Sequence, residues 1–372
     1  MSTISKTILH VIGSTGFGGG ERYLLDLIRF SSMGYRHVAA APHHGPLTGQ
    51  MDAAGYDCRV ISMPRIPSIT SIIRLCRICR LEKVDIVHSH GFRANLYGRL
   101  AAVLCRKPHV ATVHVSLYDY LETPPLIRCF YRLVEKYSSP VTRRFICISE
   151  SMAADLRRLG IRADRMIVVE NGIDADRFSA AYDVHTIKRK FGISGRHPVI
   201  GTVGRLVSEK GQIFLIEALP ALTSDFPELA CLFVGDGPLS QSLKQTAMKA
   251  GVPHICRFTG PVADVAQVYA VLDVFILPSL REPFGLAALE AMASGVAVIA
   301  TDAGGPAEYI RPEVNGMLVP PGRSAALADA ISRMLADRSV RESLARAGRQ
   351  TVTRQFDIRK TVEKIEAVYA VL

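Results

Sequence analysis

The chain has 372 residues, of which 48% are hydrophobic and 21% charged, and its formal net charge is +11. This length and composition predict a globular protein of two domains with a large core. A basic protein can bind nucleic acid, an anionic membrane or a phosphorylated substrate. The sequence lacks zinc-finger spacing and an aromatic RNA-binding motif, so we expect no nucleic-acid partner.

Strand-like apolar runs alternate with helical patterns through the first half of the chain. Strands are expected at 7–12, 37–41, 57–61, 86–88, 109–113, 144–148 and 166–169, with helices that include 20–32, 69–81 and 94–105. The run 8–12 ends at glycines without a cleavage site, which is typical of a first strand and not of a signal peptide. This alternation predicts a parallel sheet with helices on both faces.

The alternation stops in a polar, basic segment at 171–198 and then resumes. Strands are expected at 199–203, 230–234, 255–259, 274–277, 298–300 and 316–319, and helices at 212–222, 241–250, 262–271, 286–294 and 324–335. We therefore predict an α/β protein of two doubly wound, Rossmann-like domains, residues 1–178 and 179–356, facing across a deep cleft that holds the ligand. The last helix, about 357–372, is predicted to cross back onto the first domain.

Cysteine and charge distribution bear on location. The eight cysteines are scattered, mostly inside apolar runs, so we expect reduced, buried thiols in a cytoplasmic protein. No run approaches the roughly 20 apolar residues of a membrane-spanning helix. Most of the excess positive charge lies in residues 1–178, where basic residues interleave with isoleucines over 69–83 and with aromatic residues over 116–145. This pattern is typical of peripheral attachment to an anionic membrane, and equally of a helix packed on its own sheet.

The segment that follows the expected strand 274–277 is the richest in candidate site residues. Glu282 lies in the loop after the strand, Gly285 opens the next helix, and Glu290 lies inside that helix. The N-terminus of a helix suits a phosphate, and a glycine there lets the ligand approach the backbone. Glu290 can accept hydrogen bonds from ribose hydroxyls and Glu282 can hold a sugar hydroxyl. The alternative is that both glutamates are solvated helix charges.

Two further loops carry candidate residues. Arg205 and Lys210 follow the expected strand 199–203, and two cations on such a loop can converge on a diphosphate. A surface basic pair is the alternative. Gly235 and Gly237 form a tight turn after the strand 230–234, where a base or ribose can reach the backbone.

These motifs resemble glycosyltransferase family 4, whose members have the GT-B architecture. The matching stretches are GRLVSEKG from 204, VGDG from 234, FTG from 258, two glutamates eight positions apart at 282 and 290, GGGE from 18, HSH from 88 and NGID from 171. The resemblance spans nearly the whole chain in order. The glycine loop at 13–20 does not fit the dinucleotide fingerprint, which excludes a dehydrogenase.

The resemblance implies a role for each matching residue. Arg205 and Lys210 neutralise the leaving diphosphate, and Glu290 binds the donor ribose. Glu282 and the backbone around Phe284, Gly285 and Leu286 hold the transferred sugar and the phosphates. His114 reaches the donor sugar from the first domain, and Gly19 lines the cleft near the phosphates and the acceptor.

No metal or other cofactor is expected. His88, His90 and His114 could be drawn as a metal site, but we expect His88 and His90, on either side of Ser89, to point to opposite faces of their strand. The resemblance also implies that Arg205, Lys210 and the helix end replace a magnesium ion.

The expected activity is that of a retaining, metal-independent hexosyltransferase. The donor is a UDP- or GDP-sugar, and the acceptor a saccharide or lipid-linked intermediate of polysaccharide or lipopolysaccharide biosynthesis. Front-face attack, in which the leaving phosphate takes the acceptor proton, is favoured over a carboxylate nucleophile. A nucleotide-sugar 2-epimerase of the same architecture and a non-catalytic nucleotide-sugar-binding protein remain as alternatives.

Overall fold

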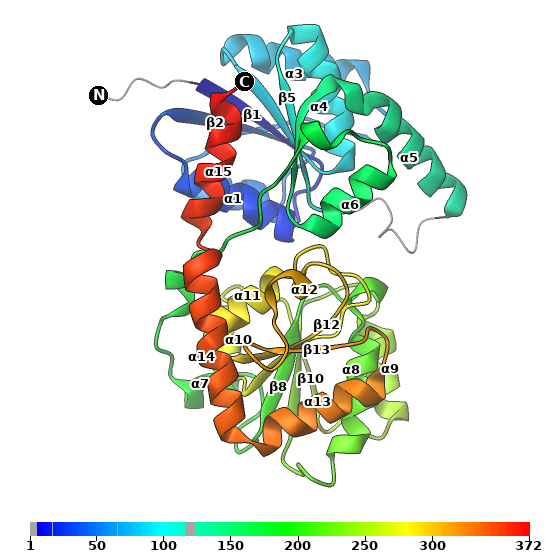
Figure 1. Cartoon of the computed structure of the whole chain (residues 1–372), viewed down its shortest axis with the longest axis vertical. Coiled ribbons are helices and arrows are strands. Elements are labelled where there is room, and N and C mark those ends of the chain that lie inside the picture. The colour runs from blue at the N-terminus through cyan, green and yellow to red at the C-terminus, as the bar shows by residue number, and fades with distance from the viewer. Residues whose placement is uncertain (1–5, 17, 65, 116–123) are drawn as a thin grey trace. The chain divides into compact units, whose positions relative to one another are not determined.

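A computed structural model describes residues 6–16, 18–64, 66–115 and 124–372. The chain divides into two compact units, and Figure 1 shows the elements of each. The first unit comprises Met1–Gly172 and Ile358–Leu372, and the second comprises Ile173–Asp357. The division therefore falls at Gly172, before the predicted boundary at residue 178.

The first unit contains a parallel sheet in the order β3-β2-β1-β4-β5-β6-β7. Its strands are β1 (Lys6–Ile12), β2 (Tyr35–Ala41), β3 (Asp57–Val60), β4 (Ile86–His90), β5 (His109–Val113), β6 (Thr142–Cys147) and β7 (Met166–Val168). Its helices are α1 (Gly19–Phe30), α2 (Pro46–Ala53), α3 (Ile69–Leu81), α4 (Phe92–Cys105), α5 (Pro125–Ser138), α6 (Glu150–Arg158) and α15 (Ile358–Ala370), with short 3₁₀ turns at Ser139–Val141 and Ala163–Arg165.

Both faces of this sheet are covered because successive side chains on a strand point to opposite sides. On β1, Leu9 packs with Leu75 of α3 and Tyr97 of α4. Its neighbour Ile8 packs instead with residues of α1 and α15. The C-terminal helix α15 lies beside α1 in Figure 1 and is part of the core of the first unit.

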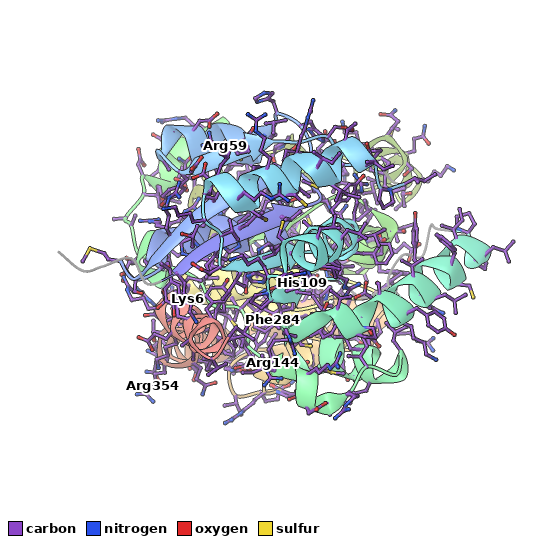
Figure 2. The ribbon with its side chains drawn as sticks, turned by 90° about the horizontal axis from the view of Figure 1, so that it is seen from above. Lys6, Arg59, His109, Arg144, Phe284 and Arg354 are labelled. Carbon is purple, nitrogen blue, oxygen red and sulfur yellow. The ribbon has the colours of Figure 1, made fainter. Side chains whose placement is uncertain are left out.

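Lys6 ties the start of β1 to the end of α15. Its Nζ atom donates to the carbonyl oxygens of Tyr369, at 2.7 Å, and Ala370, at 3.2 Å. Figure 2 shows Lys6 beside this helix. A cation at a helix C-terminus pairs with carbonyls that have no partner within the helix, so this contact stabilises the last turn of α15.

The second unit contains a parallel sheet in the order β10-β9-β8-β11-β12-β13. Its strands are β8 (Val199–Val203), β9 (Ala230–Val234), β10 (Cys256–Gly260), β11 (Val274–Leu277), β12 (Ala297–Thr301) and β13 (Met317–Val319). Its helices are α7 (Val184–Lys190), α8 (Gln212–Ala218), α9 (Ser240–Lys249), α10 (Ala266–Tyr269), α11 (Leu286–Ala293), α12 (Pro306–Tyr309), α13 (Ser324–Ala336) and α14 (Arg338–Gln355), with 3₁₀ turns at Ala175–Phe178, Ser208–Lys210 and Leu219–Leu222.

The order of strands locates a switch point in each sheet. From β1 the chain adds β2 and β3 on one side, then returns to add β4 on the other; from β8 it adds β9 and β10, then returns to add β11. Doubly wound sheets hold ligands at the carboxyl ends of the strands that flank such a point. The predicted fold class, two doubly wound parallel sheets, is confirmed. Ligand-binding residues are therefore expected in the loops after β1 and β4 and in those after β8 and β11.

Candidate functional site

In the second unit the loops that leave β8 and β11 meet through an ion pair. Lys210 Nζ lies 2.6 Å from Glu282 Oε2, and Ser279 Oγ donates to the same oxygen at 2.8 Å. The side chain of Glu282 is 6% exposed and that of Lys210 24%. A carboxylate has further acceptor sites and an ammonium three donors, so both groups keep capacity for a ligand.

The backbone holds these two loops together. Leu280 N donates to Glu209 O at 2.8 Å. Gly211 packs so tightly on the second loop that a Cβ atom there would lie 2.1 Å from Pro278 O. Arg205 lies in the same loop as Lys210 with an exposed side chain, and its carbonyl accepts from Gln212 Nε2 at 2.9 Å. The structure thus brings Lys210 to Glu282, while the convergence of Arg205 and Lys210 on a diphosphate stays a prediction.

The N-terminus of α11 lies at the end of the β11 loop. Gly285 precedes the helix with φ 90°, a conformation that strains other residues. Tyr309 Oη donates to Gly285 O at 3.0 Å, and a Cβ atom on Gly285 would lie 2.8 Å from that hydroxyl. Phe284 is buried, and Leu286 is the first residue of the helix. The first turn of α11 therefore offers backbone N–H groups next to Glu282 in the chain.

Glu290 is buried in the second turn of α11. Tyr269 Oη, from α10, donates to Glu290 Oε2 at 2.8 Å. Tyr269 is itself fully buried. Sequence reasoning selected Glu290 but missed Tyr269, because a tyrosine inside an apolar stretch indicates core packing. A role for Glu290 with ribose stays a prediction, and Tyr269 is the partner that orients its carboxylate.

Gly235 and Gly237 lie where the loop after β9 packs on the loop after β8. Gly204 N donates to Val234 O and Leu206 N donates to Asp236 O, each at 2.9 Å. A Cβ atom on Gly235 would lie 2.0 Å from Gly204 O. Gly235 is required by this close approach, which is a structural reason for the motif besides the predicted ligand contact.

In the first unit, the glycine loop after β1 lies against His114, which follows β5. Gly19 is the first residue of α1, and the ideal Cβ position of Gly20 is 3.5 Å from His114 Cδ2. The Tyr23 ring meets the His114 ring edge-on, with centroids 4.8 Å apart. Burial lowers the pKa of His114 to about 4, so the ring is neutral at neutral pH.

The prediction that His88 and His90 point to opposite faces is wrong. Residues two apart on a strand share a face, because side chains alternate with a period of two. Their ring centroids are 4.3 Å apart, and the ligand atoms of His10, His88 and His90 lie within 4.8 Å of one another. Burial lowers the pKa of all three rings well below the usual value for histidine.

This histidine trio is the one group among the described residues with the spacing of a metal site. All six ring nitrogens already make hydrogen bonds, however: His10 with His37 and His90, His88 with Tyr369 and Thr112, and His90 with His10 and His114. A metal ion would have to displace these contacts. That the protein needs no metal stays a prediction.

Two doubly wound parallel sheets in one chain fit the GT-B architecture of glycosyltransferases, and comparison with known families identifies the chain as such a protein. Residues 17–177 match the family described as Glycosyltransferase Family 4, and residues 183–351 match the family described as Glycosyl transferases group 1. The chain belongs to this family of glycosyltransferases, as the sequence motifs predicted.

Several glycosyltransferases are similar to this chain over most of its length. It is 32% identical to 2-deoxystreptamine glucosyltransferase of Streptomyces kanamyceticus over 278 residues, 71% of each protein. It is 29% identical to UDP-Gal:alpha-D-GlcNAc-diphosphoundecaprenol alpha-1,3-galactosyltransferase of Escherichia coli over 296 residues, 77% of this chain and 76% of that one. The crystal structure of Anabaena HepE in complex with UDP and glucose has the same fold, with a TM-score of 0.89 at 24% identity over 99% of this chain and 100% of that one.

Proposed function

We propose that the protein is a retaining, metal-independent hexosyltransferase that uses a UDP- or GDP-sugar and a saccharide or lipid-linked acceptor. The observation that carries the proposal is the Lys210–Glu282 pair at the switch point of the second unit, beside the first turn of α11. The relatives support the donor class, since the Escherichia coli enzyme is named for UDP-Gal and a HepE crystal contains UDP-glucose.

In this proposal, Lys210 and Arg205 neutralise the diphosphate as it leaves. Lys210 supplies a compact charge and Arg205 a fork of donors. Glu282 holds Lys210 in place and accepts from a hydroxyl of the transferred sugar, while the N–H groups of Phe284, Gly285 and Leu286 bind phosphate oxygens. Charge neutralisation by these groups takes the place of a metal ion.

Glu290 serves the ribose, with Gly235 and Gly237 close to the nucleoside. In the first unit, His114 contacts the donor sugar and Gly19 the phosphates or acceptor. We favour front-face attack, in which a phosphate oxygen takes the acceptor proton. Its supporting argument is that Glu282 and Glu290 are both already engaged by Lys210 and Tyr269, which suits binding better than nucleophilic attack.

The decisive experiment joins binding to turnover. Nucleoside diphosphates and their sugars are screened by thermal shift with and without EDTA, because a ligand of the native state raises the melting temperature with its concentration. The nucleotide that binds is then offered as its sugar with candidate acceptors. We expect stabilisation that EDTA does not change, and a product that keeps the anomeric configuration. An epimerised nucleotide sugar, or binding without any product, would support one of the two alternatives instead.

Helix α5 has the features on which we base a proposed membrane contact of the first unit. Its apolar side chains point outward: Leu126 is 85% exposed, Phe130 59% and Tyr137 75%. Basic residues accompany them at Arg128, Arg132 and Lys136, and Figure 2 shows side chains standing off along this helix. Its single buried residue is a charged one, Glu135. None of the described helices combines the length and apolar character needed to cross a bilayer.

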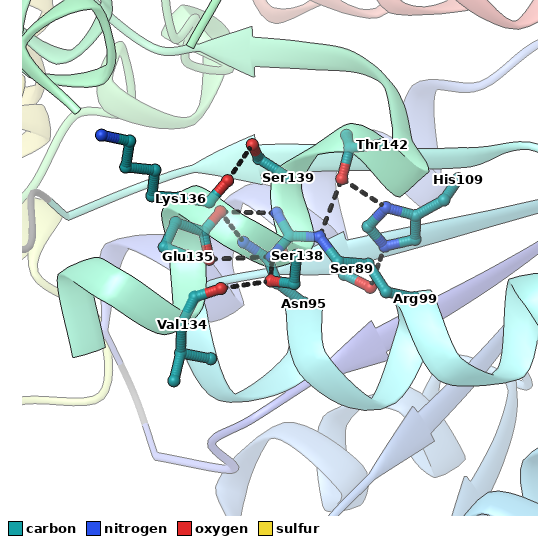
Figure 3. Close-up of polar contacts among 10 residues, drawn as sticks. All are labelled: Ser89, Asn95, Arg99, His109, Val134, Glu135, Lys136, Ser138, Ser139 and Thr142. Atoms are coloured by element: carbon teal, nitrogen blue, oxygen red, sulfur yellow. Dashed lines mark hydrogen bonds and ion pairs between the residues drawn. The ribbon is translucent and has the colours of Figure 1, made fainter. Parts of the chain in front are cut away.

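An ion pair between Arg99 and Glu135 holds α5 on the first unit with its apolar side chains exposed. Figure 3 shows the guanidinium of Arg99, on α4, between Glu135 of α5 and the hydroxyls of Ser138 and Thr142. Within the part of the chain that the structure describes, this anchor leaves apolar side chains of the helix exposed to another surface. We propose that α5 docks the protein on the inner face of the cytoplasmic membrane, where anionic lipids attract its basic residues.

Vesicle sedimentation tests this surface. Phe130→Ser is expected to weaken sedimentation with anionic vesicles at low salt, since it removes exposed apolar area from α5. Ile69→Ser is the matched control, because Ile69 is 75% exposed on α3. If the control variant loses binding and Phe130→Ser does not, α3 is the attachment site; if wild-type protein does not sediment, the membrane proposal is wrong.

A further inference from the structure

A row of hydrogen bonds in the first unit connects His114 with Glu366 on α15. His114 Nε2 lies 3.2 Å from His90 Nδ1, and His90 Nε2 lies 3.0 Å from His10 Nδ1. His10 Nε2 then lies 2.8 Å from His37 Nδ1, and His37 Nε2 lies 2.8 Å from Ser31 Oγ. The row ends where Ser31 Oγ donates to Glu366 Oε1 at 2.6 Å. We call these six residues the histidine relay.

The carboxylate end sets the direction of the first bonds. Ser31 has one hydroxyl proton, and it gives this proton to Glu366 Oε1. The same oxygen also accepts from Ser32 N at 2.7 Å, so it acts as an acceptor for two donors. Because its proton is committed, Ser31 Oγ must accept from His37, which places the proton of His37 on Nε2.

The position of the proton on one ring determines its position on the next ring. A neutral imidazole has one N–H and one acceptor nitrogen, and His37, His10 and His90 each use one ring nitrogen toward either neighbour in the relay. With Nε2 of His37 protonated, its Nδ1 accepts from Nε2 of His10, and His10 Nδ1 accepts from Nε2 of His90. His90 Nδ1 then accepts from Nε2 of His114.

The rings must be neutral for this order to hold, since an imidazolium donates from both nitrogens. Burial supplies that condition. It lowers the pKa of His37 and of His114 to about 4, and lowers the pKa of His10 and His90 well below the usual value. At neutral pH every bond of the relay therefore has one proton and one acceptor.

We propose that Ser31 and Glu366 are positioning residues that hold His114 in the Nε2–H tautomer and leave its Nδ1 atom as a hydrogen-bond acceptor. An acceptor nitrogen binds a hydroxyl, as on a sugar, whereas an ionised phosphate oxygen has no proton to give it. The consequence for catalysis rests on the proposed function, in which His114 contacts the donor sugar. The tautomer of His114 follows from the hydrogen bonds of the relay and does not depend on the proposed function.

The tautomer can be read from long-range ¹H–¹⁵N NMR spectra of protein labelled at histidine, with His114 assigned through a His114→Asn variant. We expect a pyrrole-type Nε2 and a pyridine-type Nδ1 in the wild type. Ser31→Ala and Glu366→Ala remove the end of the relay and should give a measurable population with the proton on Nδ1. Ser31→Thr keeps the hydroxyl and should restore the wild-type spectrum.

Glu363→Ala is the matched control, because Glu363 is exposed on the same helix. A wild-type His114 with its proton on Nδ1 would overturn the proposal. So would an unchanged His114 tautomer in both Ser31→Ala and Glu366→Ala. If one variant does not fold, the other still decides, and circular dichroism identifies which one that is.

The rate of sugar transfer is the second measurement that tests the proposal. In Ser31→Ala, kcat/KM is expected to fall about tenfold, the loss of one hydrogen bond worth about 1.4 kcal/mol, and Ser31→Thr should recover it. If no nucleotide sugar is turned over by wild-type protein while the tautomer responds as expected, the relay stands and the proposed function fails. If transfer occurs but the tautomer does not respond, the relay is wrong and the proposed function stands.

Discussion

Lys210 places a positive charge at the switch point of the second sheet, where a ligand is expected. It contacts Glu282 across two loops, yet a quarter of its side chain is exposed, so it can turn part of its donor capacity to a ligand. An ammonium beside a developing phosphate charge stabilises the transition state more than the ground state, which is the requirement for catalysis.

Replacing this cation should therefore cost rate more than folding. Lys210→Ala and Arg205→Ala are each expected to lower kcat roughly 100–1,000-fold, the usual effect of losing one preorganised donor. The measurement is steady-state transfer from the nucleotide sugar identified by thermal shift. Lys249→Ala, an exposed lysine on α9, serves as control. Near-normal turnover in either site variant would remove that residue from the proposed mechanism.

Single residues show what sequence could and could not reveal about the site. Glu282 and Glu290 could be selected because their spacing around a helix start is local. Tyr269 and Glu366 could not, since each meets its partner through the fold and lies far from it in the chain. Strand periodicity alone predicts that His88 and His90, which are two residues apart, point to the same face of the sheet. The expectation that they point to opposite faces holds only for adjacent residues, and was therefore wrong.

Among the elements, helix α5 is held on the first unit by a buried ion pair. Its only buried residue, Glu135, pairs with Arg99, and these side chains are 5% and 2% exposed. Arg99 also donates to Thr142 Oγ1 at 2.9 Å, which in turn contacts His109 at 3.0 Å (Figure 3). A buried pair with this many hydrogen bonds tolerates the loss of neither partner.

Breaking this pair should destabilise the first unit strongly. Arg99→Met leaves Glu135 as an unpaired buried charge and is expected to lower the free energy of unfolding by about 3–5 kcal/mol. Arg157→Met removes an exposed ion pair with Glu150 and should cost less than about 1 kcal/mol. Urea denaturation measures both, and equal losses in the two variants would contradict the role of burial.

Element boundaries followed from the sequence where a local signal existed. The predicted helix 212–222 ends as an α-helix at Ala218, because Pro220 supplies no backbone N–H, and continues as a 3₁₀ turn at Leu219–Leu222. The predicted helix 262–271 is reduced to α10, Ala266–Tyr269. Helix α5 was not predicted. Its amphipathic pattern also does not reveal that its apolar side chains lie exposed and that its buried residue is Glu135.

At the scale of the whole molecule, buried histidines tie stability to pH. Burial lowers the pKa of His10, His37, His88, His90, His109 and His114. In an unfolded chain these rings take up protons near the ordinary histidine pKa of about 6.5. In the folded chain His37 and His114 do so only near pH 4, and the pKa values of the other four rings also lie well below the ordinary value. The unfolded state thus binds more protons in that window, and stability must rise with pH there.

The native protein should therefore lose stability on mild acidification. We expect the urea midpoint to fall steadily between about pH 6.5 and about pH 5, before most carboxylates titrate. His37→Asn should flatten this dependence, because it removes one of the shifted groups. A midpoint that stays constant over this interval would show that these rings take up protons equally in the folded and unfolded chains, which would contradict the lowered pKa values.

The membership of α15 in the first unit has a consequence for biosynthesis. Glu366 and Tyr369 meet Ser31 and His88, although the whole second unit lies between them in the chain. At about 5–20 residues per second, a ribosome needs roughly ten to forty seconds to make that unit. During this time the nascent first unit lacks the helix that completes its core and the carboxylate that orders its histidines. A vectorial order of synthesis thus makes the N-terminal unit the last to mature.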